Sequence, residues 1–153
     1  MNFFYDTLEN IIKNNDITKV KENYIKLLSN LTTTTIIDNN KFIDIINKIH
    51  EMGIIYVCYI YDNEKNIIFV ASGTIIIEPK IIHGGKKVGH VEDIVVNSNF
   101  QKMGISVKIV EFLKRYGIEN DCYKIILDCN KEIKKVYEKN GFYEKDIQMV
   151  FYI

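Results

Sequence analysis

Two adjacent carboxylates, Glu92 and Asp93, stand inside the segment HVEDIVVN (residues 90–97), whose valines and isoleucines favour a β-strand. A core strand would be apolar at these positions, so the two acids need a separate explanation. Successive residues of a regular strand face opposite sides of a sheet, so both acids reach one site only if a β-bulge interrupts the alternation. The alternative is that one acid lies on a solvated face of the sheet. This explains one of the two acids, and it explains both only if the strand lies near a sheet edge.

The loop that follows, SNFQKMGIS (residues 98–106), leads into a segment with helical spacing, VKIVEFLKRYGI. A strand, a polar loop and a helix in this order are typical of phosphate-binding sites, because the first N–H groups of a helix lack partners and its dipole favours negative charge. The loop contains one glycine, Gly104. On this string alone, a plain strand-to-helix turn is the simpler interpretation.

Two further residues could carry chemistry. Asp128 ends the segment CYKIILD, and open α/β sheets place ligands at the carboxyl ends of their strands. Tyr137 follows nine residues later in a helical segment, one turn after Ile133 and Val136. Tyr137 could be a reactive residue, or it could be a core residue on an apolar helix face.

A flexible connection, EPKIIHGGKK (residues 78–87), gathers Lys80, His83, Lys86 and Lys87. Such a group is usually a solvated loop, but it could also bind a small phosphorylated substrate.

The elements that must position these residues follow from hydrophobic periodicity. The pattern predicts helices over residues 8–31 and 39–53, with an N-cap among residues 38–40, then a hairpin of strands 54–61 and 67–78 ended by Pro79. It then predicts a strand at 90–97, a helix after Gly104, a strand at 122–130, a helix at 131–141 and a last strand at 146–153. This order indicates an α/β (α+β) fold in one domain spanning residues 1–153, with a mixed central sheet flanked by helices.

Composition excludes several classes of function. The 153 residues are 47% hydrophobic, and 20 basic residues balance 20 acidic ones, so nothing favours a nucleic-acid partner and self-association is compatible with the low charge. No apolar run approaches membrane-spanning length and the N-terminus does not resemble a signal peptide, so we expect a cytoplasmic protein without a membrane partner. Cys58, Cys122 and Cys129 lack metal-ligand spacing, which predicts buried free thiols and no metal.

Four strings, taken together in order and spacing, resemble the GNAT superfamily of acetyl-CoA-dependent N-acetyltransferases: IIIEPKIIH, GHVEDIVVNSNFQ, CYKIILDCN and VYEKNGF. Within that superfamily the chain is similar to the glucosamine-6-phosphate N-acetyltransferases. The resemblance covers roughly residues 70–145. It implies direct acetyl transfer from acetyl-CoA to the amine of glucosamine 6-phosphate, a step toward UDP-N-acetylglucosamine, by a homodimer whose substrate sites are built partly from the second chain.

The resemblance also implies roles for particular residues. A backbone N–H near Val95 would bind the developing oxyanion, Asp128 would orient or deprotonate the sugar amine, and Tyr137 would protonate the departing thiolate. The residues expected to contact the sugar phosphate are Lys80, Ile81, Ile82, His83, Glu92, Asp93 and Asp128. Those expected to contact the cofactor are Ile94, Val95, Val96, Gln101, Lys102, Met103, Gly104, Ile105, Ser106, Tyr137, Glu138 and Lys139.

The chain departs from the family pattern at two places. The loop ends in Ser106, where the family has glycine or alanine, and the last residues, QMVFYI, lack the basic residue that reaches the sugar phosphate in the family. Lys80, Lys86 or Lys87 would then have to counter the phosphate. Two alternatives follow: a GNAT enzyme for another amine, or a CoA-binding dimer that has lost catalysis. An α/β domain without a ligand is a third.

Overall fold

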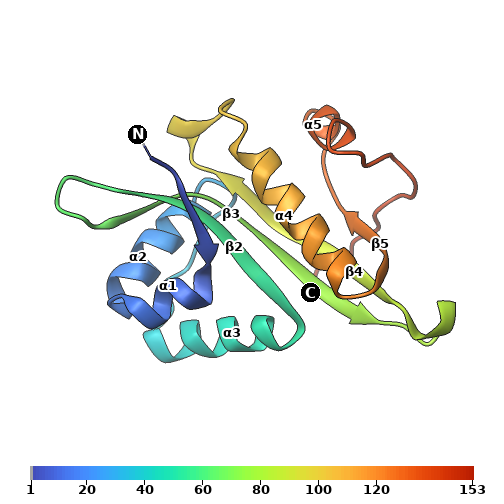
Figure 1. Ribbon diagram of the computed structural model, residues 1–153, viewed down its shortest axis with the longest axis horizontal. Coiled ribbons are helices and arrows are strands. Elements are labelled where there is room, and N and C mark those ends of the chain that lie inside the picture. The colour runs from blue at the N-terminus through green and yellow to red at the C-terminus, as the bar shows by residue number, and fades with distance from the viewer. Residues whose placement is uncertain (1) are drawn as a thin grey trace.

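A five-stranded mixed sheet forms the centre of the protein in the computed structural model, which describes residues 2–153 (Figure 1). The strands lie in the order β1-β2-β3-β4-β5, and neighbours are antiparallel except for the parallel pair β4 and β5. The strands are β1 Phe4–Thr7, β2 Gly53–Tyr61, β3 Ile67–Pro79, β4 Lys87–Val96 and β5 Cys122–Leu127. The helices are α1 Leu8–Asn14, α2 Ile17–Leu28, α3 Asn39–Met52, α4 Ile105–Glu119 and α5 Lys134–Glu138, with short 3₁₀ turns at His83–Gly85 and Ser98–Phe100.

The centre of the sheet agrees with the sequence. Strands β2 and β3 pair antiparallel, as predicted for the hairpin, and their turn is closed by a bond from the amide of Asp62 to the carbonyl of Asn66 (3.0 Å). Strand β3 ends at Pro79, which has no N–H for a further ladder bond. The mixed α/β class predicted from the order of elements is confirmed.

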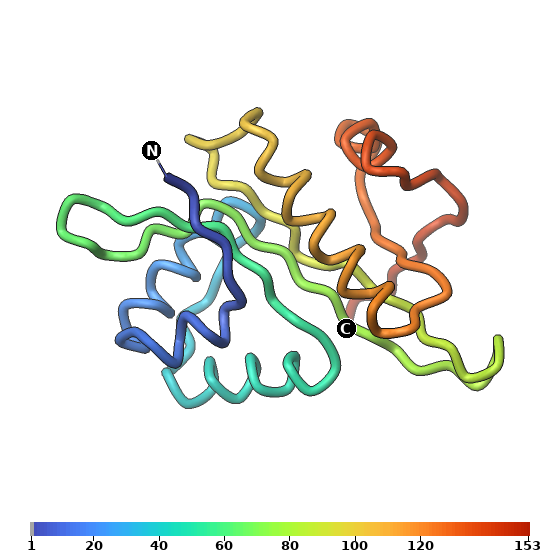
Figure 2. The backbone as a smooth tube through the Cα atoms, in the orientation of Figure 1, coloured from blue at the N-terminus to red at the C-terminus, as the bar shows by residue number. Residues whose placement is uncertain are grey.

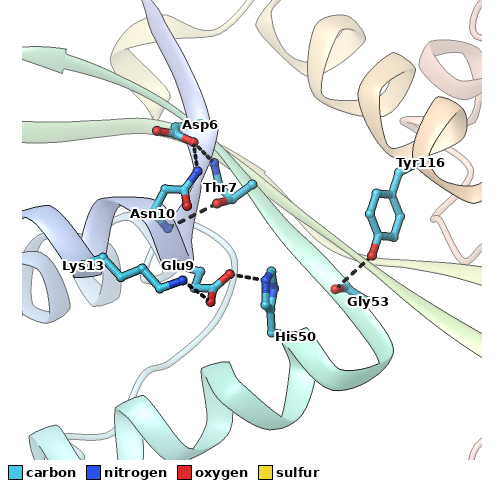
Figure 3. Close-up of polar contacts among 8 residues, drawn as sticks. All are labelled: Asp6, Thr7, Glu9, Asn10, Lys13, His50, Gly53 and Tyr116. Carbon is cyan, nitrogen blue, oxygen red and sulfur yellow. Dashed lines mark hydrogen bonds and ion pairs between the residues drawn. The ribbon is translucent and has the colours of Figure 1, made fainter.

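The N-terminal region differs from its prediction. The segment predicted as one helix contains two, and the break lies at Asp16, whose carboxylate caps α2 by accepting from the amide of Lys19 (2.9 Å). Strand β1 was not predicted, because four residues are too few to establish an alternating pattern. Thr7 caps α1 by accepting from the amide of Asn10 (3.2 Å; Figure 3). Asp38 caps α3, as predicted.

The two faces of the sheet carry separate hydrophobic clusters. Helices α1, α2 and α3 cover one face over strands β2 and β3, and α4 packs across the other face. Leu8, Leu27, Ile109 and Leu113 are fully buried in these layers, and burial of each such side chain stabilises the fold by about 1.5–3 kcal/mol. On the first face, the carboxylate of Glu9 links α1 to α3 through an ion pair with His50 (Figure 3).

The predicted last strand is wrong: residues 146–153 form no regular element (Figure 2). A strand persists only where its backbone groups find a pairing partner, and this segment pairs with no strand of its own chain. Its apolar side chains face solvent, with Met149 88% and Phe151 90% exposed. The segment therefore presents apolar surface that its own chain leaves uncovered.

Candidate active site

Strand β4 contains the β-bulge that its paired carboxylates require. Ser72 of β3 pairs with Val95, and Thr74 pairs with Glu92, so one residue of β3 opposes two residues of β4. The first of these two, Asp93, has a positive φ of 52°. Both Glu92 and Asp93 are exposed, which a regular strand with one buried face would not allow.

Asp128 directly follows β5 and lies level with Glu92, which stands within β4 at the start of its bulge. Val91 pairs with Leu127, so Glu92 and Asp128 are the next residues of two neighbouring parallel strands. Partial burial, followed by the charges of Asp93 and Asp128, raises the pKa of Glu92, while His90 lowers it. The three carboxylates therefore form one acidic surface suited to a cationic or hydroxyl-rich group.

The loop before α4 has the geometry of an anion site. Gly104 precedes the helix with φ 74° and ψ 8°, and no side chain caps the first N–H groups of α4. The first turn of α4 contains no acidic residue. Lys102, also at positive φ (62°), adds an exposed cation to the same loop. Backbone donors, helix dipole and lysine charge would all favour a pyrophosphate at this end of α4.

The remaining residues that were predicted to contact the cofactor differ in their exposure to solvent. Ile105 is buried in the core, so only its backbone could contact a ligand, whereas Met103 is 57% exposed. Glu138 faces Lys134 at 3.4 Å, and Lys139 ends α5. The partly accessible positions are Ile94, Val96 and Ser106, and the exposed ones are Gln101, Lys102, Glu138 and Lys139.

Tyr137 of α5 is largely buried, and its ring meets Phe142 edge to face with centroids 6.2 Å apart. Burial raises the pKa of Tyr137, with a smaller contribution from Cys129, the neighbour of Asp128. The phenol therefore remains protonated near neutral pH and lies within electrostatic reach of the chain that follows β5. Tyr137 can therefore pack in the core and also donate a proton.

The predicted sugar-phosphate residues of the β3–β4 connection, Lys80, Ile81, Ile82 and His83, belong to the projecting tip at one end of the molecule (Figure 2). Six residue steps along β4, about 20 Å, separate Lys87 at the base of this tip from Asp93. Within one chain Lys80 nevertheless contacts Glu78, whose other carboxylate oxygen lies 2.7 Å from His90, on the face of Glu92. The ammonium of Lys80 lies 2.5 Å from a carboxylate oxygen of Glu78, and that of Lys86 lies 3.8 Å from Asp121.

Two polar contacts of this region were not predicted. The Nε2 atom of His90 lies 2.7 Å from Glu78, and Gln148 of the C-terminal segment donates to Asp128 (2.7 Å). The first contact depends on the register of β3 against β4, which the sequence does not give. The second had no signal either, because Gln148 and Asp128 are 20 positions apart and Gln148 belongs to a segment predicted to be a strand. Within residues 2–153 no three side chains group as metal ligands.

Known proteins match this arrangement. The model of the acetyltransferase (GNAT) family matches residues 28–142, a range that contains the bulge, the α4 loop, Asp128 and Tyr137. The chain belongs to the GNAT acetyltransferase family. The GNAT fold predicted from the order of elements is thereby confirmed, and acetyl-CoA is the acetyl donor that this family uses. No helix among residues 2–153 has the length and apolar character needed to cross a bilayer.

Among GNAT proteins, this chain is similar to curated relatives over almost their full lengths. It is 36% identical to glucosamine 6-phosphate N-acetyltransferase of Arabidopsis thaliana, covering 92% of this chain and 95% of the relative. The enzyme of the same name from Candida albicans is 37% identical, with coverage of 88% and 89%. The crystal structure of the Arabidopsis thaliana enzyme superposes with a TM-score of 0.83 over 99% of both chains, at 31% identity.

Proposed function

We propose that the protein transfers the acetyl group of acetyl-CoA to the amine of D-glucosamine 6-phosphate, giving N-acetylglucosamine 6-phosphate and CoA. The observation that carries the proposal is the near-complete coverage of relatives bearing that enzyme's name, together with an acidic surface formed by the bulge of β4 and the end of β5. Carboxylates there suit a sugar that presents an amine and several hydroxyl groups. We further propose a cytoplasmic role in supplying precursors of UDP-N-acetylglucosamine.

The donor would be held mainly by backbone. The free N–H groups at the start of α4, with Lys102 beside them, support a pyrophosphate site. Residues 94–96, beyond the bulge, would pair with the extended arm of the cofactor as an added strand does. A backbone N–H near Val95 would donate to the carbonyl oxygen as it gains negative charge, an interaction whose loss commonly costs about 2.7–4 kcal/mol.

Two side chains would move the protons. Asp128 would accept a proton from the sugar ammonium or orient the neutral amine, because an amine attacks only when it is neutral. Tyr137, protonated near neutral pH, would donate to the departing thiolate. The raised pKa of Tyr137 and its position near residue 129 support this assignment. No acyl-enzyme is needed, since the chain holds both reactants together.

We propose that the active form is a homodimer. Two features support this. The apolar side chains of residues 146–153 are exposed and would be covered by a second copy, and the projecting tip at residues 80–83 would contact that copy. The tip would then bring His83 and Lys80 to the acidic surface of the other chain. Sedimentation equilibrium tests this: a monomer at micromolar concentration would contradict it, and truncation after residue 145 should abolish a dimer.

A second candidate is a GNAT enzyme for another amine, such as a polyamine. It is favoured by one observation: Glu92, Asp93 and Asp128 form an acidic surface, while Lys80 and Lys86 face carboxylates of their own chain. A panel of acceptors distinguishes the two, using glucosamine 6-phosphate, glucosamine and spermidine at equal concentration. The proposed function requires a clear preference for the phosphorylated sugar, and a preference for spermidine would reject it.

A further inference from the structure

The bulge of β4 is a strained element inside an otherwise regular ladder. Asp93 has a positive φ, a region that residues other than glycine rarely adopt. A single residue of β3, Gly73, lies opposite the two bulged residues of β4, Asp93 and Ile94. Strained backbone persists only where the surrounding structure determines it strongly. The packing around the bulge should therefore contain groups that hold it.

One buried hydrogen bond lies directly beside the bulge. The hydroxyl groups of Tyr24 in α2 and Ser72 in β3 are 2.9 Å apart, although the residues are separated by 48 positions. Ser72 is fully buried and is the residue that pairs with Val95. Two buried hydroxyl groups in an apolar layer stabilise the fold little more than an apolar pair of the same shape would. Their presence at this position therefore suggests a purpose other than stability.

The ring of Tyr24 is fixed on several sides. It contacts Phe69 edge to face at 5.5 Å and Phe42 of α3 at 6.2 Å, so the direction of its hydroxyl is determined by packing. Burial raises the pKa of Tyr24 to about 12; its bond to Ser72 opposes this and the charge of Asp93 adds to it. The phenol is thus neutral and lies within electrostatic reach of the bulged residue itself.

We propose that Tyr24 and Ser72 are positioning residues that fix the bulge of β4 and, through it, the directions of the backbone N–H groups of this segment. The link runs from α2 through the two hydroxyl groups to β3, and across the ladder to Val95, whose side chain packs in the same buried cluster as Tyr24. The catalytic consequence rests on the proposed function, which assigns a backbone N–H near Val95 to the oxyanion. The structural consequence, a fixed bulge, does not depend on the proposed function.

The test compares Tyr24→Phe with a matched control. Tyr116→Phe also removes one phenol oxygen that ties a helix to the sheet, since Tyr116 of α4 donates to the carbonyl of Gly53 at 3.4 Å (Figure 3). Gly53 pairs with Ile76, three residues along β3 from Gly73. Tyr24→Phe should lower kcat about tenfold with KM for acetyl-CoA within twofold, because a displaced donor weakens only the transition state. Tyr116→Phe should leave both values within twofold.

The second measurement is independent of activity. Backbone amide chemical shifts of Asp93, Ile94 and Val95 should move in Tyr24→Phe and Ser72→Ala and stay in place in Tyr116→Phe. The double variant Tyr24→Phe/Ser72→Ala should lower kcat no further than either single change, since one bond is removed in each case. Unmoved amide shifts, or equal losses of kcat in Tyr24→Phe and the control, would overturn the proposal. If the wild type shows no transferase activity, the proposed function fails and the amide shifts alone decide the positioning role.

Discussion

Replacing Gly73 with alanine tests the geometry of the bulge most severely. The added methyl group would lie 2.4 Å from Cδ1 of Ile94, 2.7 Å from Cγ2 of Ile109 and 3.0 Å from Cδ1 of Leu113. Carbon atoms in contact are normally about 3.5–4.0 Å apart. Ile109 and Leu113 are fully buried, so neither can move into free space, and Ile94 is the second residue of the bulge itself.

Overpacking of this kind costs about 1–3 kcal/mol of unfolding free energy. With a urea m-value of roughly 1–3 kcal/mol per molar, the midpoint of urea denaturation should fall by about 1 M. Turnover should fall as well, because the overlap with Ile94 displaces the bulge. The double variant Gly73→Ala/Ile94→Val removes the atom with the closest overlap and should recover part of both losses. An unchanged midpoint in Gly73→Ala, or a double variant no better than the single one, would refute this reasoning.

Three further predictions concern the acidic surface and the proton donor. Tyr137→Phe keeps the ring contact with Phe142 and should lower turnover roughly a hundredfold with CoA affinity nearly unchanged by calorimetry; unchanged turnover would remove the hydroxyl from the chemistry. Asp128→Asn still accepts from Gln148, so it should impair use of the sugar and spare CoA binding, whereas a joint loss of both would make Asp128 structural. Glu92 has a raised pKa, so the folded state binds its proton more tightly than the unfolded state and loses stability as pH rises through this range. Glu92→Gln should therefore be more stable than wild type at pH 7 in urea denaturation, with a difference that disappears below the usual glutamate pKa of 4.5; a variant less stable at pH 7 would contradict the assignment.

Local patterns were sufficient for much of the fold and for part of the site. Alternating apolar residues predicted β2, β3 and the β4–loop–α4 unit, and two adjacent carboxylates predicted that a bulge was needed to bring both to one surface. These features are encoded within short stretches of chain, where periodicity and turn residues carry the information. The positions of Glu92 and Asp128 at the same level of neighbouring strands also follow from strand order once the strands are parallel.

Features that depend on distant contacts could not be predicted. The bond between Tyr24 and Ser72 joins segments 48 residues apart, and neither residue belongs to a recognisable motif. The C-terminal pattern predicted a strand, yet a strand forms only when a partner supplies the ladder, and within this chain residues 146–153 have none. The contact between His90 and Glu78 joins residues 12 positions apart and depends on the pairing of β3 with β4.

The central claim is that this chain acetylates a phosphorylated amino sugar. The most direct test measures free-thiol release from acetyl-CoA by the purified protein, alone, with glucosamine and with glucosamine 6-phosphate. The account predicts release that requires the sugar and is much faster with the phosphorylated form. Release that is equal with both sugars, or absent with both in a protein that binds CoA, would contradict it.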